Sequence, residues 1–234
     1  MATDTPTMGR PRGFDEEAAL DLAVEVFWRQ GYEGTSISDL TDAMGINRPS
    51  LYATYGNKEQ LFHRAFDRYR KTKTAYIANA FEQPTAYAVI ESFLRGSADA
   101  LTADGHPLGC LSVQGGLACS PRNAGIPDAL AAGRATTERA LAQRLARATQ
   151  DGDLQEKTDP QALARFVMIL SEGFAVHATA GTEPADLHAS IDIALQSVTA
   201  LCSPPPRPDH AAGPAGHPGT ARQDGKYGDT APAA

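Results

Sequence analysis

Residues 35–58 read TSISDLTDAMGINRPSLYATYGNK, and this stretch decides the fold of the region around it. Ser36 and Asp39 have the spacing of a capping box, in which each side chain satisfies a backbone N–H of the other residue. A helix is therefore predicted to begin at Ile37. Its apolar residues recur at helical spacing as far as Gly45, which can adopt the left-handed conformation that commonly ends a helix.

A second short helix is predicted directly after this turn. Asn47 can cap it, and Pro49 fits its first turn. Leu51 and Tyr55 lie one turn apart and are expected to face the core. The residues left for the outer surface are Arg48, Ser50, Tyr52 and Thr54. This order of helix, turn and helix predicts a helix-turn-helix, whose second helix enters the DNA major groove.

The charge balance needs to be read locally. The chain has 234 residues and a net charge of −7, which as an average argues against nucleic acid as a partner. Residues 43–58, however, contain Arg48 and Lys58 and no acidic residue, so a positive edge is expected there. The most apolar run, residues 166–170, is far shorter than the roughly 20 residues that span a bilayer, and the N-terminus lacks an apolar signal segment. We expect a cytoplasmic protein with no membrane partner.

The cysteines and histidines do not form a recognisable metal-binding pattern. The three cysteines are an odd number without CxxC spacing, which argues against a disulfide framework and a structural zinc site. The histidines of the folded region share no HxxH or HxxxH pairing. Neither a metal nor a cofactor is therefore expected.

The rest of the chain reads as amphipathic helices, which predicts an all-α protein. One unbroken helix of about six turns is expected from Lys58 to Phe81, because this segment contains neither Pro nor Gly. Further helices are expected from Pro84, over residues 126–150, and in two closing segments that begin near residues 159 and 184. The helix over residues 126–150 is expected to direct its arginines, Arg144 among them, outward.

The match to a known family is carried by residue type and spacing at more than a dozen positions. These are Ala18-Ala19, Phe27, Gly31-Tyr32, Thr35-Ser36-Ile37, Asp39-Leu40, Ala43, Gly45-Ile46, Leu51-Tyr52, Tyr55-Gly56, Lys58 and Leu61-Phe62. Over roughly residues 14–66 the chain resembles the N-terminal domain of the tetracycline-repressor (TetR) family of transcriptional regulators. The resemblance implies a homodimeric regulator, more often a repressor, that binds a palindromic double-stranded DNA operator and responds to a small-molecule effector. It implies no enzymatic activity.

The resemblance also implies the two domains and roles for the outward residues, whereas the composition of the two ends of the chain predicts an arm and a tail. The expected parts are a flexible arm (1–13), a helix-turn-helix domain (14–62), a helical ligand-binding and dimerisation domain (63–202) and a disordered tail (203–234). Arg48, Pro49 and Ser50 look like the residues that meet base edges. Backbone contacts are expected from Thr35, Ser36, Tyr52 and Lys58, and the predicted DNA-binding set is completed by Asn47 and Thr54.

A candidate effector pocket is expected where apolar or reactive side chains converge in the second domain. The predicted set is Tyr69, Phe93, Leu94, Cys110, Leu117, Phe166 and Leu170. Cys110 has two readings: it is a small core residue, or it is a reactive thiol after a loop and at a helix N-terminus. Part of the resembling family uses a Gly-Cys-Leu cysteine, here Cys110, for sensing electrophiles or oxidants.

The last two helices carry apolar residues on more than one side, which leaves surface for a partner. In the resembling family these helices pair as a four-helix bundle, so a homodimer is expected through them. Two other functions stay open at this point. One is an enzyme with nucleophilic Cys110 or Cys119, and the other is a protein-binding adaptor that kept the fold without DNA recognition.

Overall fold

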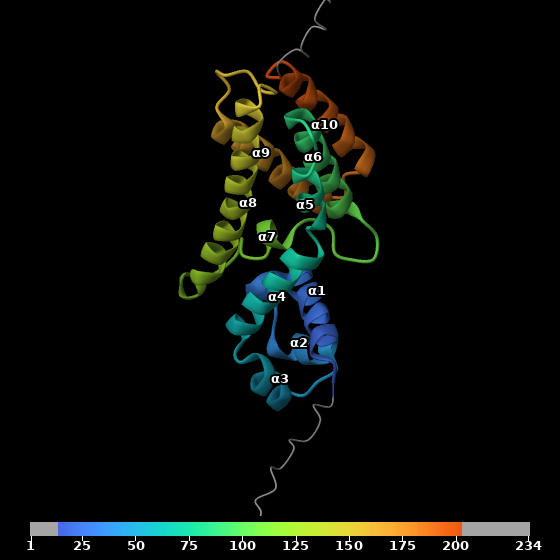
Figure 1. Cartoon of the computed structure of the whole chain (residues 1–234). Helices are drawn as coiled ribbons and strands as arrows, with labels where there is room; N and C mark the ends of the chain where they lie inside the picture. The colour runs from blue at the N-terminus through green and yellow to red at the C-terminus, as the bar shows by residue number, and fades with distance from the viewer. Residues whose placement is uncertain (1–13, 203–234) are drawn as a thin grey trace, which may run out of the picture. The chain divides into compact units, whose positions relative to one another are not determined.

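The computed structural model describes residues 14–202 and confirms the all-α fold class (Figure 1). Within these residues the regular elements are ten α-helices and one short 3₁₀ helix, with no strand. In chain order they are α1 (Glu16–Gly34), α2 (Ile37–Met44), α3 (Arg48–Tyr55), α4 (Lys58–Thr72), α5 (Ala75–Phe81), α6 (Ala86–Thr102), α7 (Leu111–Gln114), η1 (Pro121–Asn123), α8 (Gly125–Gln150), α9 (Pro160–Thr179) and α10 (Pro184–Thr199). The predicted arm (1–13) and tail (203–234) lie outside the described residues.

The helix-turn-helix forms as the sequence predicts. The Ser36 hydroxyl accepts a hydrogen bond from the Asp39 N–H at 3.1 Å, and the Asp39 carboxylate accepts one from the Ser36 N–H at 2.7 Å. This capping box begins α2, and Gly45 ends it in the left-handed conformation with φ 65°. The Asn47 side chain then accepts from the Ser50 N–H at 2.9 Å and begins α3.

Two hydrophobic cores organise the described chain. The first lies among α1 to α4, which we call the head, and is centred on aromatic residues such as Phe27, Trp28 and Phe62. It also receives Leu111 from α7 and side chains from the start of α8. The second core lies among α6, α8, α9 and α10. Because the first core runs along α4 to Tyr69, the division at residue 62 stays a prediction.

The long helix expected from Lys58 is interrupted. α4 ends at Thr72, and α5 begins only at Ala75. The hydroxyls of Thr72 and Thr74 donate to the carbonyls of Arg68 and Arg70, at 2.9 and 2.6 Å. Side chains of this type compete with the backbone for the hydrogen bonds that would continue a helix. The prediction of one rigid helix of six turns was therefore wrong.

Two further expectations need correction. The helix predicted from Pro84 begins at Ala86, because Thr85 provides the cap through a hydrogen bond from the Ala88 N–H. Arg144, predicted to face outward, is buried, and its guanidinium donates to the carbonyls of Phe81 and Gln83. Periodicity could not reveal this role, since the acceptors belong to the turn between α5 and α6.

α9 is a helix of the second core. By length and composition alone it could cross a membrane. It packs instead between α6 and α8, and its buried face is formed by Leu163, Val167 and Phe174 together with small residues. We therefore describe it as a core helix.

Candidate functional site

The outer face of α3 is the first candidate site. Leu51 and Tyr55 are buried, and the Tyr55 hydroxyl donates to the Glu16 carbonyl at 2.7 Å, which fixes α3 against α1. The opposite face is therefore turned to solvent. Asn47, Arg48 and Pro49 are exposed, Tyr52 is 49% exposed, and Ser50 and Thr54 are partly exposed.

Arg48 is the cation of this face. One of its terminal nitrogens donates to the Ser38 hydroxyl of α2 at 2.8 Å, and both groups are exposed. The bond holds the guanidinium beside the first turn of α3 and leaves its other N–H donors free. A guanidinium presented in this way can donate two parallel hydrogen bonds to the acceptors of a guanine edge.

Three of the residues predicted to contact the DNA backbone differ in their surroundings. Thr35 is only 2% exposed, and its hydroxyl donates to the Gly31 carbonyl at 2.6 Å, so its side chain is not free for a phosphate. The Ser36 hydroxyl is exposed but accepts the capping bond of α2. The Lys58 ammonium lies 4.4 Å from the centre of the Tyr32 ring, and burial lowers its pKa against the opposing influence of Glu33.

The second candidate site is a cavity of about 70 Å³ bounded by α4 to α9. Of the predicted pocket residues, Tyr69, Phe93 and Cys110 line it. Leu94 and Leu170 belong to the second core instead. Phe166 and Leu117 are 39% and 76% exposed, and none of these four residues lines this cavity, so their role in effector binding stays a prediction. They were chosen for apolarity, which does not distinguish a core residue from a pocket residue.

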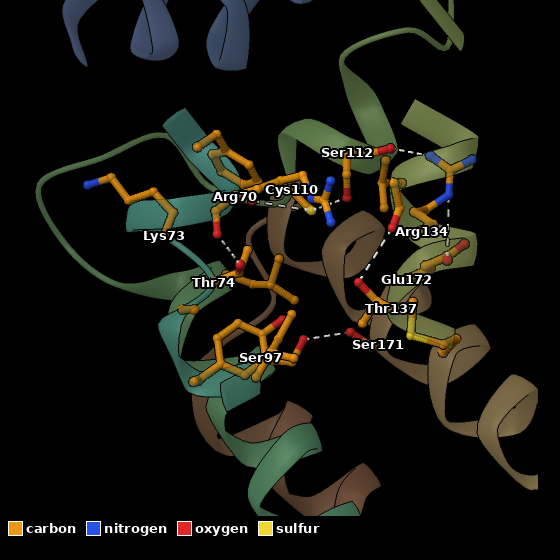
Figure 2. Close-up of a pocket in the computed structure, with 18 of the residues that line it drawn as sticks. Arg70, Lys73, Thr74, Ser97, Cys110, Ser112, Arg134, Thr137, Ser171 and Glu172 are labelled. Atoms are coloured by element: carbon orange, nitrogen blue, oxygen red, sulfur yellow. Dashed lines mark hydrogen bonds and ion pairs between the residues drawn. The ribbon is translucent and has the colours of Figure 1, made fainter. Parts of the chain in front are cut away.

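Hydroxyl groups surround the Cys110 thiol (Figure 2). The Tyr69 hydroxyl donates to the Cys110 sulfur at 3.3 Å, and the Ser112 hydroxyl lies 2.9 Å from the same sulfur. Burial, followed by the nearby Cys110, raises the pKa of Tyr69 well above its usual range and that of Tyr76 to about 12. Both phenols are thus protonated at neutral pH and can donate hydrogen bonds. Cys110 itself is partly exposed and precedes α7, a helix of only four residues.

The polar lining of the cavity was missed at the sequence level. Arg134 of α8 donates to the Ser112 carbonyl and lies 3.6 Å from a Glu172 oxygen of α9. Burial raises the pKa of Glu172, and Arg134 opposes this. Ser97 and Ser171 share a hydrogen bond of 2.7 Å across α6 and α9. No motif marks such residues, because their proximity depends on how the helices pack.

The arrangement around the cysteines does not resemble a nucleophile with its base. The His106 ring stacks on Trp28, with 4.8 Å between centroids, and its Nδ1 is 3.0 Å from the Pro107 carbonyl. Within residues 14–202 no hydrogen bond joins a histidine to Cys110 or Cys119. Burial and then Glu33 raise the pKa of Cys119, which disfavours its thiolate. No group of three metal-ligating side chains occurs in the same described range.

The segment that follows Cys110 is hydrogen-bonded to the head. The Tyr32 N–H donates to the Gly115 carbonyl at 2.8 Å. One carboxylate oxygen of Glu33 accepts from the N–H and hydroxyl of Ser120 and from the side chain of Asn123, at 2.7, 2.6 and 2.8 Å. These bonds lower the pKa of Glu33 to about 2. Cys110 is thus five positions before the first attachment to the end of α1, at Gly115, and ten to thirteen positions before the second, at Ser120 and Asn123.

Two family models match the chain. The one described as bacterial regulatory proteins, tetR family, matches residues 19–65, which overlap the predicted helix-turn-helix domain (14–62) and extend three residues beyond it. The one described as tetracyclin repressor-like, C-terminal domain, matches residues 86–193, from α6 into α10.

Individual relatives are similar to this chain along most of its length. The HTH-type transcriptional repressor ComR of Escherichia coli strain K12 is 34% identical over 188 residues, which are 77% of this chain and 90% of ComR. Among solved structures, a cysteine double mutant of the TetR family regulator CifR, complexed with 26-base-pair operator DNA, is 38% identical with a TM-score of 0.78 and covers 80% of this chain and 99% of its own. A TetR transcriptional regulator from Rhodococcus sp. RHA1 is 44% identical with a TM-score of 0.54, over 79% and 98%.

Proposed function

The chain belongs to the tetR family of bacterial regulatory proteins and is a DNA-binding transcriptional regulator, and from this premise we propose that it is a cytoplasmic repressor released from its operator when a small molecule or electrophile engages Cys110. The observation that supports this proposal is the position of that thiol. The thiol lines a cavity. The segment that begins at Cys110 is also hydrogen-bonded to the end of α1 through Tyr32 and Glu33.

In the DNA complex, α3 reads the operator. Arg48, with Pro49 and Ser50, meets base edges in the major groove, and Tyr52 donates its hydroxyl to a phosphate, with Asn47, Thr54 and Ser36 beside them. Thr35 and Lys58 are positioning residues, because one is buried against Gly31 and the other lies over the Tyr32 ring.

Substitutions separate these roles. Arg48→Ala should relax base preference by about 1–3 kcal/mol per half-site, whereas Tyr52→Phe should weaken all sequences alike by about 0.5–1.5 kcal/mol. Lys58→Ala should leave the salt dependence of binding unchanged. Fluorescence anisotropy on the DNA upstream of the gene, at several salt concentrations, measures all three. A salt slope shallower by about one unit for Lys58→Ala would restore Lys58 as a phosphate contact.

A homodimer supplies the second head. The outer side of α9 presents Phe166, Ile169 and Val176 at helical spacing, and Ile169 is 62% exposed. Gly173 lies on the same stripe with open space at its missing Cβ, so a partner helix can approach closely. Ile193 of α10 is 69% exposed as well. An apolar stripe on the two closing helices fits a second copy of the chain.

The dimer is tested by charging this stripe. Ile169→Lys should convert the protein to a monomer in sedimentation and abolish operator binding at concentrations where the native protein binds. Leu22→Lys is the matched control, because Leu22 is an exposed apolar residue of α1, 42% exposed and remote from α9 in sequence. If Ile169→Lys remains dimeric, the interface lies elsewhere.

Release follows from linkage between two conformations. An effector weakens operator binding by the difference between its binding free energies for the two states, and by no more. We place the mechanical connection in residues 110–123, because this segment begins at the pocket thiol and is held to α1 through Tyr32 and Glu33. The break between α4 and α5 makes a single rigid lever less suitable for this role.

The cysteine is tested by its own substitution. In a gel shift, 1,4-benzoquinone should release the native protein and Cys119→Ser, but not Cys110→Ser. Release that persists in Cys110→Ser would make Cys110 a core residue. Absence of any salt-sensitive, sequence-specific shift would instead favour the adaptor alternative. The enzyme alternative has the weaker support, since no histidine within the described residues is hydrogen-bonded to either cysteine of the pocket region.

A further inference from the structure

The charged side chains that line the Cys110 pocket are mostly cations. They are Arg70 and Lys73 near the end of α4 and Arg134 on α8, against Glu172 as the acidic member of the lining. Arg134 and Glu172 form an ion pair at 3.6 Å and largely offset one another. Within residues 14–202, neither Arg70 nor Lys73 has a carboxylate within 4 Å. The pocket therefore carries two cations that no ion pair neutralises, although the chain as a whole has a net charge of −7.

Arg70 is an exposed arginine of α4 that lines the pocket and, unlike Arg134, has no ion-pair partner among the described residues. Its guanidinium is turned toward the side that holds Cys110 and Ser112, whereas the Lys73 ammonium points away at the rim (Figure 2). The Arg70 guanidinium carbon lies 6.0 Å from the centre of the Phe66 ring. Gly133 faces the same wall, where a Cβ would come within 2.9 Å of the Phe66 ring and 3.9 Å of the Arg70 Cδ. The small residue on α8 thus leaves room for the Phe66 ring, beside which the Arg70 side chain lies.

Neutral donors complete the lining. The phenols of Tyr69 and Tyr76 stay protonated at neutral pH, for the reason given above, and the serines of α6 and α9 add hydroxyls. Donors of this kind beside a guanidinium suit the two oxygens of a carboxylate. The volume of about 70 Å³ limits the ligand to a few non-hydrogen atoms unless the pocket opens.

We propose that the effectors of this pocket are small electrophiles that carry a carboxylate, such as short α,β-unsaturated carbonyl acids, and that Arg70 selects them over neutral analogues. The inference deepens the proposed release at Cys110 but concerns only which reagent reaches the thiol. In the reaction, the Cys110 sulfur bonds to the β-carbon and the C=C π-bond breaks. The α-carbon takes up the proton that the thiol loses, so no oxidant or reductant is needed.

Two reagents of equal size and leaving group test this selectivity. Iodoacetate and iodoacetamide both alkylate a thiolate with loss of iodide, and the thiol proton passes to solvent, but only iodoacetate is an anion. Peptide mass spectrometry gives the rate for each reagent at each cysteine of the intact protein. The ratio of iodoacetate to iodoacetamide rates at Cys110 should exceed that of 2-mercaptoethanol by about fivefold or more, since an unpaired guanidinium on the pocket wall attracts the anion and not the neutral amide. Cys119, which lies near both Glu33 and Lys58, is the internal reference and should show no such excess, because these two charges oppose one another.

Variants assign the effect to one side chain. Arg70→Gln should reduce the Cys110 ratio to that of 2-mercaptoethanol, and Arg70→Glu should reduce it further. Lys71→Gln is the matched control, because Lys71 is the next residue of the same helix and is exposed as Arg70 is, but does not line the pocket. Added salt should lower the ratio at Cys110 and leave that of Cys119 nearly unchanged.

Other outcomes overturn the proposal. It fails if Cys110 shows no excess over the reference thiols, if Arg70→Gln and Lys71→Gln behave alike, or if neither reagent modifies Cys110 in the folded protein. None of these results depends on DNA. Failure of the regulator proposal would appear separately, as unmodified protein that does not shift its operator.

Discussion

Gly31 divides α1 into two parts, and its replacement by alanine tests how the head is attached to the pocket segment. Its backbone has φ 67° and ψ 175°, a region that is essentially restricted to glycine. A Cβ at this position would also lie 3.4 Å from the Gly115 carbonyl oxygen, the acceptor of the Tyr32 N–H. Alanine must therefore either adopt a strained conformation or displace the segment that follows Cys110.

The strain sets the expected magnitude. A residue other than glycine in this region costs about 1–3 kcal/mol. Because a domain of this kind unfolds with roughly 5–15 kcal/mol, the Gly31→Ala protein should still fold. With a urea slope of about 2 kcal/mol per molar, the midpoint of unfolding should fall by roughly 1 M. The carbonyl contact itself adds little, since 3.4 Å is close to an ordinary van der Waals distance.

Urea unfolding at one protein concentration, followed by circular dichroism, measures the change. Gly34→Ala is the matched control: it lies in the same helix, and its added Cβ would meet only the Gln30 Cβ at 3.6 Å. This control should be neutral or slightly stabilising, because alanine is the better helix former. Equal midpoints for the two variants would refute the argument that Gly31 is required by its backbone conformation.

Two further predictions concern interactions that hold the turns around the pocket. Arg144→Met should lower the free energy of unfolding by about 2–4 kcal/mol, because the substitution leaves the carbonyls of the α5–α6 turn without their charged donor. Arg147 lies on the exposed side of the same helix, so Arg147→Met should change the free energy of unfolding by less than about 0.5 kcal/mol in the same urea assay. The Glu33 carboxylate has a pKa lowered to about 2, so its contribution to stability is present above about pH 4.5 and is lost as the pH falls toward 2. The unfolding temperature of Glu33→Gln should therefore fall less than that of the native protein as the pH is lowered between those values. If the unfolding temperatures of the two proteins fall in parallel, the contacts to Ser120 and Asn123 do not depend on the charge of Glu33.

Much of the head was predictable from local sequence. The capping box at Ser36, the left-handed Gly45 and the cap at Asn47 are interactions between residues at most four positions apart, so their spacing in the chain already implies the geometry. The same holds for the inward direction of Leu51 and Tyr55, which follows from one helical turn. The remaining residues of α3 must then face outward.

The pocket was less predictable. Of the predicted residues, Tyr69, Phe93 and Cys110 line the cavity and the other four do not, because apolarity marks burial rather than a cavity wall. Arg70 belonged to a basic run that the sequence alone presents equally well as a solvated face. Only its position opposite Gly133, on another helix, makes it a pocket residue.

By itself, the sequence determined the helix-turn-helix, the all-α class and the residues that face outward on α3, since each depends on hydrogen bonds and periodicity within a few residues. The tertiary structure decided that Arg144 closes a turn rather than facing solvent, and that Cys110 lies between a cationic pocket and the two attachments to α1. These features join residues about 40 to 110 positions apart, such as Tyr32 with Gly115 and Tyr69 with Cys110. Contacts at that separation depend on how helices pack, and no local pattern in the chain encodes them.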